Sequence, residues 1–384
     1  MKYINSFFNE YKFPIIVFLV WRVGLSLILL FAINFVPLQK NFLGGGMGNY
    51  LKNPYFWSWL NFDGEHYLSI AQSGYKSLQH FYFPLYPVLV GLIASFFNKS
   101  IENLALVGLV LSNLSFLFAL VGLWKLVRLD YTAEVARTTL VLLTVFPTSF
   151  YFGSFYTESL FLLTVVWSFY FFRKSNFFWA AVFGIFASAT RSIGVILLPV
   201  FLGEYFLTSK HKKNFKLAFL LFIPLGLAAY MYYLYLTTGN AFAFNYSGHI
   251  FGEYRSQNPV ILPRVIYRYI FKILPNLNYT YFAGTFPTLL EFLVAMWLLT
   301  VTIISVSKIR LAYWFYLLGA FITPTLYLSF VSTPRYALVA FPAFIVTASA
   351  LATRPKVLQL TIFGLLLTVQ FAAFAMFSRG FWIS

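Results

Sequence analysis

Long, uninterrupted apolar runs constrain the fold of this chain more than any other feature. The hydrocarbon core of a bilayer takes about 20 apolar residues in a helix, and continuous rather than alternating runs disfavour a transmembrane barrel. The sequence predicts an all-α, multi-pass membrane protein of one domain, residues 1–384, with about 11 transmembrane helices. The expected helices lie near residues 13–36, 104–124, 138–154, 157–172, 177–190, 192–207, 217–236, 286–306, 311–330, 336–352 and 357–377.

The composition supports this fold class and limits the partners. Of the 384 residues, 60% are hydrophobic and only 10% are charged, whereas a soluble domain has about a quarter of its residues charged. The net charge of +17 comes from small basic groups between apolar runs, which is typical of contact with lipid headgroups. We therefore expect membrane lipids, and no nucleic acid, among the partners. The absence of cysteine excludes disulfides and thiolate metal sites.

The basic groups also predict the topology, because short loops rich in Lys and Arg face the cytoplasm. If the N-terminus and the five basic groups listed below all lie in the cytoplasm, the chain must cross the membrane an even number of times between each group and the next. Residues 81–97 are apolar and contain two prolines, and the even count predicts that they form a re-entrant or interfacial element instead of a full crossing. The groups are Lys125/Arg128/Arg137, Arg173/Lys174, Lys210/Lys212/Lys213/Lys216, Lys308/Arg310 and Arg354/Lys356.

The same count places two long loops outside. Residues 37–103 form the first extracytoplasmic loop, with interfacial helices, and residues 237–285 form the second. The second loop contains four basic residues, including Arg255, but long loops translocate largely regardless of charge. We predict an integral protein of the plasma (inner) membrane, with a cytoplasmic N-terminus and the unusual polar residues gathered on the extracytoplasmic face.

Three ionisable residues lie within four positions of the stretch "WLNFDGEHYLSIAQSGY". They are Asp63, Glu65 and His66, in a chain with only ten acidic residues. If this stretch is helical, His66 and Tyr67 share a face with Asp63, because residues three and four apart are neighbours on a helix. The alternative is that Asp63 only caps the helix.

Three further charged residues interrupt apolar sequence: Glu158 in "FPTSFYFGSFYTESLFLL", Arg191 in "SATRSIGVILLP" and Arg335 in "STPRYALVAFPAF". A charge at membrane depth is costly, so it favours a functional site. A guanidinium at a helix N-terminus suits phosphate. Each residue has a structural alternative: a capping box with Thr157 and Tyr156 as local partners for Glu158, snorkelling to the interface for Arg191, and an interfacial anchor beside Tyr336 for Arg335.

No motif for a metal or nucleotide site is present. His80 and His249 have no partners at metal-ligand spacing, and the glycine-rich residues 43–49 lack the Lys-Ser/Thr of a P-loop. We expect no cofactor, although a carboxylate pair could bind a divalent cation weakly. Arg22, in the first apolar run, is expected to be structural.

Four stretches together resemble a known enzyme family. "DGEHYLSIAQSGY", "FYFPLYPVLVGLI", "FPTSFYFGSFYTESLFLL" and "SATRSIGVILLP" are similar to the GPI mannosyltransferase 2 (phosphatidylinositol-glycan class V) family and its bacterial relatives. The similarity covers residues 55–205 and extends loosely over the chain. It implies a GT-C glycosyltransferase fold, with a catalytic aspartate in the first extracytoplasmic loop and a second acidic residue in the next outer loop. Asp63 and Glu158 match these catalytic positions.

The resemblance implies an inverting hexosyltransferase that moves a sugar, with mannose expected, from a polyprenyl-phosphate donor to a hydroxyl of a glycan, lipid or protein. Asp63 is then the general base, and an arginine offsets the charge on the leaving phosphate. The rival interpretations are a lipid or lipid-linked-sugar transporter, whose inverted repeats are not visible here, and a scaffold subunit. The expected substrate-binding residues are Glu65, His66, Tyr67, His80, Arg191, Arg335 and Tyr336.

Overall fold

The computed structural model describes residues 2–39, 47–208, 214–246, 260–326 and 329–383. Within these ranges every regular element is a helix and there is no strand, so the predicted all-α class is confirmed. Four features of the sequence lie outside the described residues: Lys210, Lys212 and Lys213 of one basic group, residues 43–46 of the glycine-rich run, His249 and Arg255.

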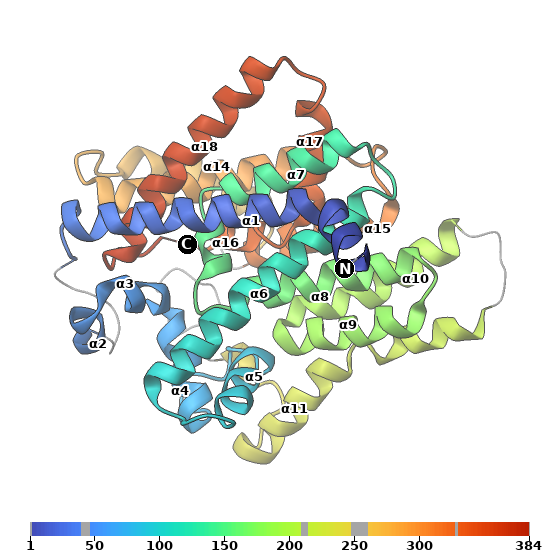
Figure 1. The fold of residues 1–384 in the computed structure, drawn as a ribbon, viewed down its shortest axis with the longest axis horizontal. Coiled ribbons are helices and arrows are strands. Elements are labelled where there is room, and N and C mark those ends of the chain that lie inside the picture. Colours follow the sequence, from blue (N-terminus) through green and yellow to red (C-terminus); the bar gives the residue numbers. More distant parts are fainter. Residues whose placement is uncertain (1, 40–46, 209–213, 247–259, 327–328, 384) are drawn as a thin grey trace.

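The described part of the chain contains eighteen α-helices and six short 3-10 or π segments (Figure 1). The α-helices are α1 Lys2–Phe35, α2 Met47–Lys52, α3 Pro54–Trp57, α4 Asp63–Ser73, α5 Leu85–Ala94, α6 Ile101–Val127, α7 Ala133–Val145, α8 Glu158–Arg173, α9 Phe177–Thr190, α10 Leu197–Thr208, α11 Leu225–Thr238, α12 Ala243–Tyr246, α13 Leu262–Arg268, α14 Phe282–Ile304, α15 Leu311–Thr325, α16 Thr333–Ala337, α17 Phe341–Leu351 and α18 Lys356–Ser378. The connecting segments are η1 Ser58–Leu60, η2 Ser149–Gly153, η3 Ser192–Ile196, η4 Phe215–Phe222, η6 Tyr269–Ile273 and η7 Leu274–Asn276.

Among the residues that the structure describes, five helical segments are long and apolar enough to cross a membrane. They expose large apolar side chains, such as Val20 (67% exposed) and Leu365 (63% exposed), as helices in contact with lipid tails do. The chain is therefore an integral membrane protein. The other expected crossings correspond to shorter apolar helices, so the count of about 11 stays a prediction. The five segments are Tyr11–Phe35, Ile101–Val127, Phe215–Thr238, Phe282–Ile304 and Lys356–Ser378.

The first long loop forms short helices, α2 to α5. α5 has ten residues and is about 15 Å long, half the hydrocarbon thickness. That residues 81–97 do not cross the membrane stays a prediction, because other expected crossings, such as α17, are helices of similar length. α5 packs closely on α4, because a Cβ at Gly91 would come within 2.9 Å of the Ala71 carbonyl oxygen. The Tyr86 hydroxyl joins α5 to α6 by donating to the Gly108 carbonyl at 2.9 Å.

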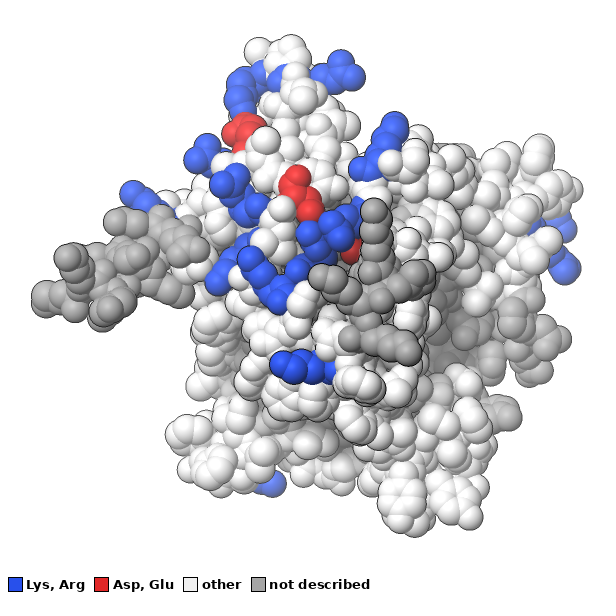
Figure 2. All heavy atoms as spheres, turned by 90° about the vertical axis from the view of Figure 1, so that its right-hand side faces the viewer, with Lys and Arg blue, Asp and Glu red and all other residues white. Residues whose placement is uncertain are grey.

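A group of basic residues lies on the side of the molecule away from α2 and α3. In Figure 1, α2 to α5 lie on the left-hand side, and α10 ends at the right-hand side. Figure 2 views that right-hand side and shows Lys and Arg side chains gathered there. Lys and Arg gathered at one end of the molecule are what the loop-charge rule associates with the cytoplasmic face. Which end faces the cytoplasm stays a prediction.

Helix interruptions bring charged side chains into the interior. The run expected as one helix over 138–154 is divided, because α7 ends at Val145 just before Pro147, and the residue before a proline avoids the helical region. The chain continues as η2, and α8 then begins at Glu158. Likewise α9 ends at Thr190 just before Arg191, and Arg335 lies in the five-residue α16. The termini of these elements meet in the site described next.

Candidate active site

Asp63 is the first residue of α4 and is largely buried, with 15% of its side chain exposed. One carboxylate oxygen lies 2.5 Å from Nη1 of Arg335, and the other accepts a hydrogen bond from the Tyr82 hydroxyl at 3.0 Å. Within the described chain no side chain caps the start of α4. The capping alternative for Asp63 is therefore wrong, because its carboxylate binds residues distant in sequence.

Backbone strain immediately precedes Asp63. Phe62 has a φ of 62°, in the region that favours glycine, and such a residue costs of order 1–3 kcal/mol and occurs preferentially at functional sites. The Phe62 ring is held between Phe377 (ring centroids 5.5 Å apart) and Trp382 (5.0 Å). This packing fixes the point at which α4 begins, and hence the direction of the Asp63 side chain.

Glu158 is fully buried at the start of α8. Its Oε1 forms an ion pair with Nη2 of Arg191 and lies 3.1 Å from Nε of Arg335, at an angle that does not make a hydrogen bond. Its Oε2 has no hydrogen-bond partner among the described residues. No side-chain cap forms with Thr157 in this part of the structure, so the capping alternative for Glu158 is also wrong.

Arg191 lies at the junction of α9 and η3, with 12% of its side chain exposed. Nε and Nη2 both donate to the Thr157 hydroxyl at 3.1 Å. A snorkelling side chain would place its charged end in water, so this burial and pairing contradict that alternative. Nη1 is buried and has no hydrogen-bond partner in the described ranges, which leaves a donor for a ligand.

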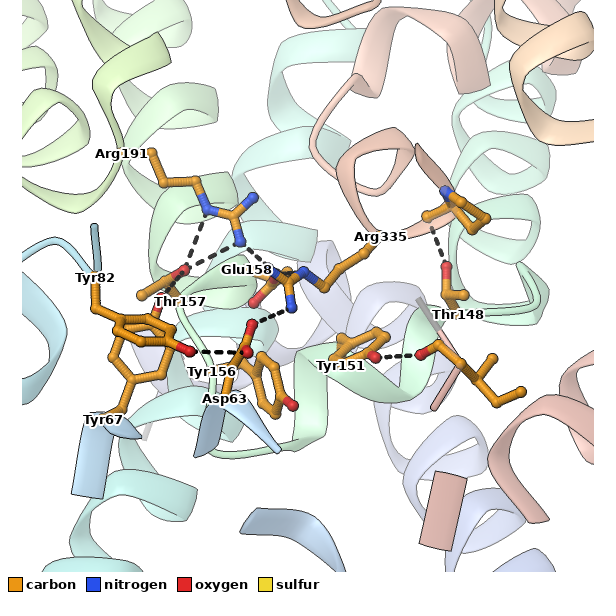
Figure 3. Close-up of polar contacts among 12 residues, drawn as sticks. Asp63, Tyr67, Tyr82, Thr148, Tyr151, Tyr156, Thr157, Glu158, Arg191 and Arg335 are labelled. Carbon is orange, nitrogen blue, oxygen red and sulfur yellow. Dashed lines mark hydrogen bonds and ion pairs between the residues drawn. The ribbon is translucent and has the colours of Figure 1, made fainter. Parts of the chain in front are cut away.

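Arg335 joins the two carboxylates. Its side chain is 10% exposed, and its guanidinium lies 5.6 Å from the ring centroids of Tyr151 and Tyr156. The interfacial-anchor alternative for Arg335 is therefore wrong. Figure 3 shows the resulting chain of contacts from Arg191 through Glu158 and Arg335 to Asp63 and Tyr82. We call Asp63, Glu158, Arg191 and Arg335 the charge cluster; with two acids and two arginines its formal charge is zero.

Three other predicted residues border the charge cluster. Tyr67 is buried, with its hydroxyl 3.5 Å from that of Thr157. The Tyr336 ring lies beside both arginines, 5.5 Å from Arg191 and 5.8 Å from Arg335. His66 stacks on Tyr82 with ring centroids 5.0 Å apart. Partial burial lowers the pKa of His66 below its ordinary value, and the nearby Asp63 carboxylate acts in the opposite direction.

Two residues that were expected to bind substrate, Glu65 and His80, are not among those that border the charge cluster. The ion pairs and hydrogen bonds that join the charge cluster are made without Glu65, which is partly exposed on α4. His80 stacks on Tyr75, with ring centroids 5.9 Å apart, and its carbonyl accepts a hydrogen bond from Tyr230 of α11 at 2.6 Å. Its side chain thus packs in an aromatic group with α11, and burial lowers its pKa.

Sequence reasoning missed several contributors: Tyr82, which binds Asp63, and Tyr151 and Tyr156, which enclose Arg335. With 27 tyrosines in the chain, residue type gives no signal for these three. Across the described ranges, no three His, Asp or Glu side chains come together in a way that could hold a metal ion. Both cluster carboxylates are instead paired with arginines.

The chain was compared with known proteins. No protein-family model matches the sequence, and no curated protein matches it. A solved structure that it resembles is the Archaeoglobus fulgidus oligosaccharyltransferase tethered with an acceptor peptide containing the NVT sequon via a disulfide bond, at 12% identity and a TM-score of 0.45. The match covers 97% of this chain and 55% of that one, so the chain spans about half the length of that protein. Membership of the GPI mannosyltransferase 2 family stays a prediction.

Proposed function

We propose that this protein is a membrane glycosyltransferase of the GT-C type, which transfers a sugar from a polyprenyl-phosphate donor to an acceptor hydroxyl with inversion at the anomeric carbon. The observation that carries the proposal is the Arg335 guanidinium between two buried carboxylates, Asp63 and Glu158. This arrangement supplies a base and a phosphate-binding cation within one site. The family resemblance makes mannose the expected sugar and the extracytoplasmic face the expected side of the site.

Asp63 is the general base in this proposal. Its carboxylate takes the proton of the acceptor hydroxyl as that oxygen bonds to the anomeric carbon. The bond from this carbon to the donor phosphate breaks, and the phosphate leaves with the electron pair. The Tyr82 hydroxyl, 3.0 Å from Asp63 Oδ1, orients the carboxylate while Oδ2 faces Arg335.

The arginines bind the phosphate. A guanidinium matches phosphate geometry and retains its charge, and Arg191 Nη1 has no hydrogen-bond partner within the described chain. Arg335 is 2.5 Å from Asp63, so a phosphate that draws this guanidinium toward itself also removes a cation from the base. Donor binding then activates Asp63, because loss of a neighbouring positive charge raises the proton affinity of a carboxylate.

Glu158 holds both arginines in position, and its second oxygen orients the acceptor. Buried between Arg191 and Arg335, it keeps two like charges close together that would otherwise repel. The acceptor, whether a glycan, a lipid or a protein, would donate a hydrogen bond from one of its hydroxyl groups to Oε2.

The test is sugar transfer from polyprenyl-phosphate-mannose by the purified protein in lipid vesicles. Asp63→Asn keeps the shape of the side chain but cannot accept the proton, and we expect transfer to fall by about 10²–10⁴-fold, the usual contribution of a general base. Glu102→Gln, at an exposed position of α6, is the matched control and should retain the wild-type rate. Unchanged turnover in Asp63→Asn would refute the general-base assignment. Movement of labelled donor across the bilayer without product would favour the transporter interpretation.

A further inference from the structure

A cavity lies between α1, the α3–η1 segment and α6, and no residue of the charge cluster lines it. Its volume is about 530 Å³. The polar residues of its lining are Arg22, Asn53, Tyr55, Trp59 and Asn113.

This cavity adjoins the surface that contacts lipid. Leu106 and Val110 line it from α6 and are 52% and 47% exposed. Arg22 and Asn113 lie on α1 and α6, within two of the segments long and apolar enough to cross a membrane. Side chains exposed on such helices face lipid tails, so a lipid molecule can reach the cavity laterally from the bilayer.

Arg22 brings an incompletely paired cation to this cavity. Its guanidinium stacks over the Trp59 ring at 3.9 Å, while Nη1 is buried without a hydrogen-bond partner among the described residues. A Cβ at Gly153 would come within 2.7 Å of Nη1, so the glycine provides the space that the guanidinium occupies. A cation within a membrane-spanning segment normally forms an ion pair or faces a polar cavity, and it is therefore taken to indicate a functional site.

Asn113 brings an unpaired acceptor to the same cavity. Its amide nitrogen donates to the carbonyls of Leu109 at 2.7 Å and Gly153 at 3.3 Å. Its Oδ1 is buried and accepts no hydrogen bond within the described part of the chain. A buried polar atom without a partner costs about 1–3 kcal/mol. A ligand that satisfies both groups carries an anion for Arg22 and a hydroxyl or amine donor for Asn113 Oδ1.

We infer that this cavity binds the headgroup of an anionic glycerophospholipid with a hydroxylated headgroup. The phosphodiester pairs with Arg22, a headgroup hydroxyl donates to Asn113, and the acyl chains leave the cavity along exposed apolar side chains of α1 and α6, such as Leu19 and Leu114. Basic pockets between transmembrane helices bind lipid headgroups in this way. The site makes Arg22 a ligand-binding residue instead of the purely structural one expected from sequence. It requires no sugar transfer and so stands apart from the proposed function.

The test measures phosphatidylglycerol bound to the delipidated, full-length protein by native mass spectrometry. Arg22→Gln removes a charge-assisted contact, and we expect at least about tenfold weaker binding. Asn113→Asp is a second variant that does not depend on tolerance of a lost arginine. Its carboxylate keeps the shape of the amide and repels the lipid phosphate, so phosphatidylglycerol binding should fall. Because the carboxylate cannot donate to the Leu109 and Gly153 carbonyls, the thermal stability of this variant is measured alongside to show that it is folded. Arg128→Gln, which removes an exposed cation just after α6, is the charge-matched control and should bind like wild type.

The lipid comparisons decide the outcome. Stronger binding of phosphatidylglycerol than of phosphatidylcholine, lost in Arg22→Gln and Asn113→Asp but not in Arg128→Gln, supports the inference. Equal binding of the two lipids, or no effect of either cavity variant, overturns it. Binding that depends on Arg22 for polyprenyl phosphate alone also overturns it, because the cavity would then serve the proposed donor.

Discussion

Neutralising Glu158 tests whether the charge cluster is a coupled electrostatic unit. Glu158 is fully buried and faces two guanidinium groups, those of Arg191 and Arg335. Removing one partner of a buried pair costs about 3–5 kcal/mol, because the other charge is left uncompensated. Glu158→Gln is therefore expected to lower the free energy of unfolding by about this amount. The measurement is reversible unfolding in mixed micelles titrated with sodium dodecyl sulfate.

Glu134→Gln is the matched control. Glu134 also pairs with two cations, Arg137 and Lys356, but their side chains are 55% and 71% exposed. Exposed pairs contribute about 0–1 kcal/mol, so this variant should unfold almost as the wild type does. Equal losses in the Glu158 and Glu134 variants would refute the reasoning.

A double variant separates charge imbalance from loss of contacts. Glu158→Gln gives the cluster a formal charge of +1, because one acid remains beside two arginines. Combining it with Arg191→Gln returns the formal charge to zero. The double variant should therefore lose less stability than the sum of the two single variants, with a coupling of about 0.5–3 kcal/mol. Strict additivity would show that the cluster is not coupled.

Two further predictions concern activity and pH. Arg335→Lys keeps the charge but cannot span both carboxylates, so we expect at least about tenfold slower transfer from polyprenyl-phosphate-mannose; a wild-type rate would contradict the role given to the guanidinium. Because burial lowers the pKa of His66, the unfolded chain binds this proton more readily than the folded chain does. Stability should then fall as the pH drops from about 6.5 through the lower folded pKa. His66→Gln should lessen this loss, and an identical pH profile in the variant would show that His66 does not contribute to it.

The helices were predictable because their signal is local, whereas many boundaries were not. The apolar run over 138–154 indicates a helix, but Pro147 divides it into α7 and η2. The proline is visible in the sequence, yet long membrane helices such as α1 and α14 continue through internal prolines. Neighbouring helices can satisfy the freed backbone groups, so tertiary packing decides which proline ends a helix.

The charge cluster was predictable in part, for a thermodynamic reason. Asp63, Glu158, Arg191 and Arg335 are conspicuous because burying a charge in apolar sequence is costly, and the loop-charge count brings them to one face. The sequence did not show which acid pairs with which arginine. It also did not show that Tyr82 completes the contacts of Asp63, because such pairings depend on side-chain directions between helices distant in sequence.

The position of Arg335 depends on contacts outside its own helix. α16 has only five residues, too few to be stable alone, and it follows Ser332, whose φ of 66° is unfavourable for a residue other than glycine. Three contacts hold this segment: Thr148 donates to the Pro334 carbonyl at 2.7 Å, the Phe330 amide donates to the Tyr269 hydroxyl at 3.1 Å, and that hydroxyl donates to buried Glu291 at 3.2 Å.

Two of these contacts link the charge cluster to the second long loop. Tyr269 belongs to the segment 237–285, and Glu291 belongs to α14, so the loop and a long apolar helix together fix the turn that precedes Arg335. Since Arg335 is tethered through its backbone while its guanidinium contacts Asp63, a bound phosphate can draw the guanidinium away without moving α16. The release of Asp63 in the proposed mechanism therefore needs only a side-chain rotation.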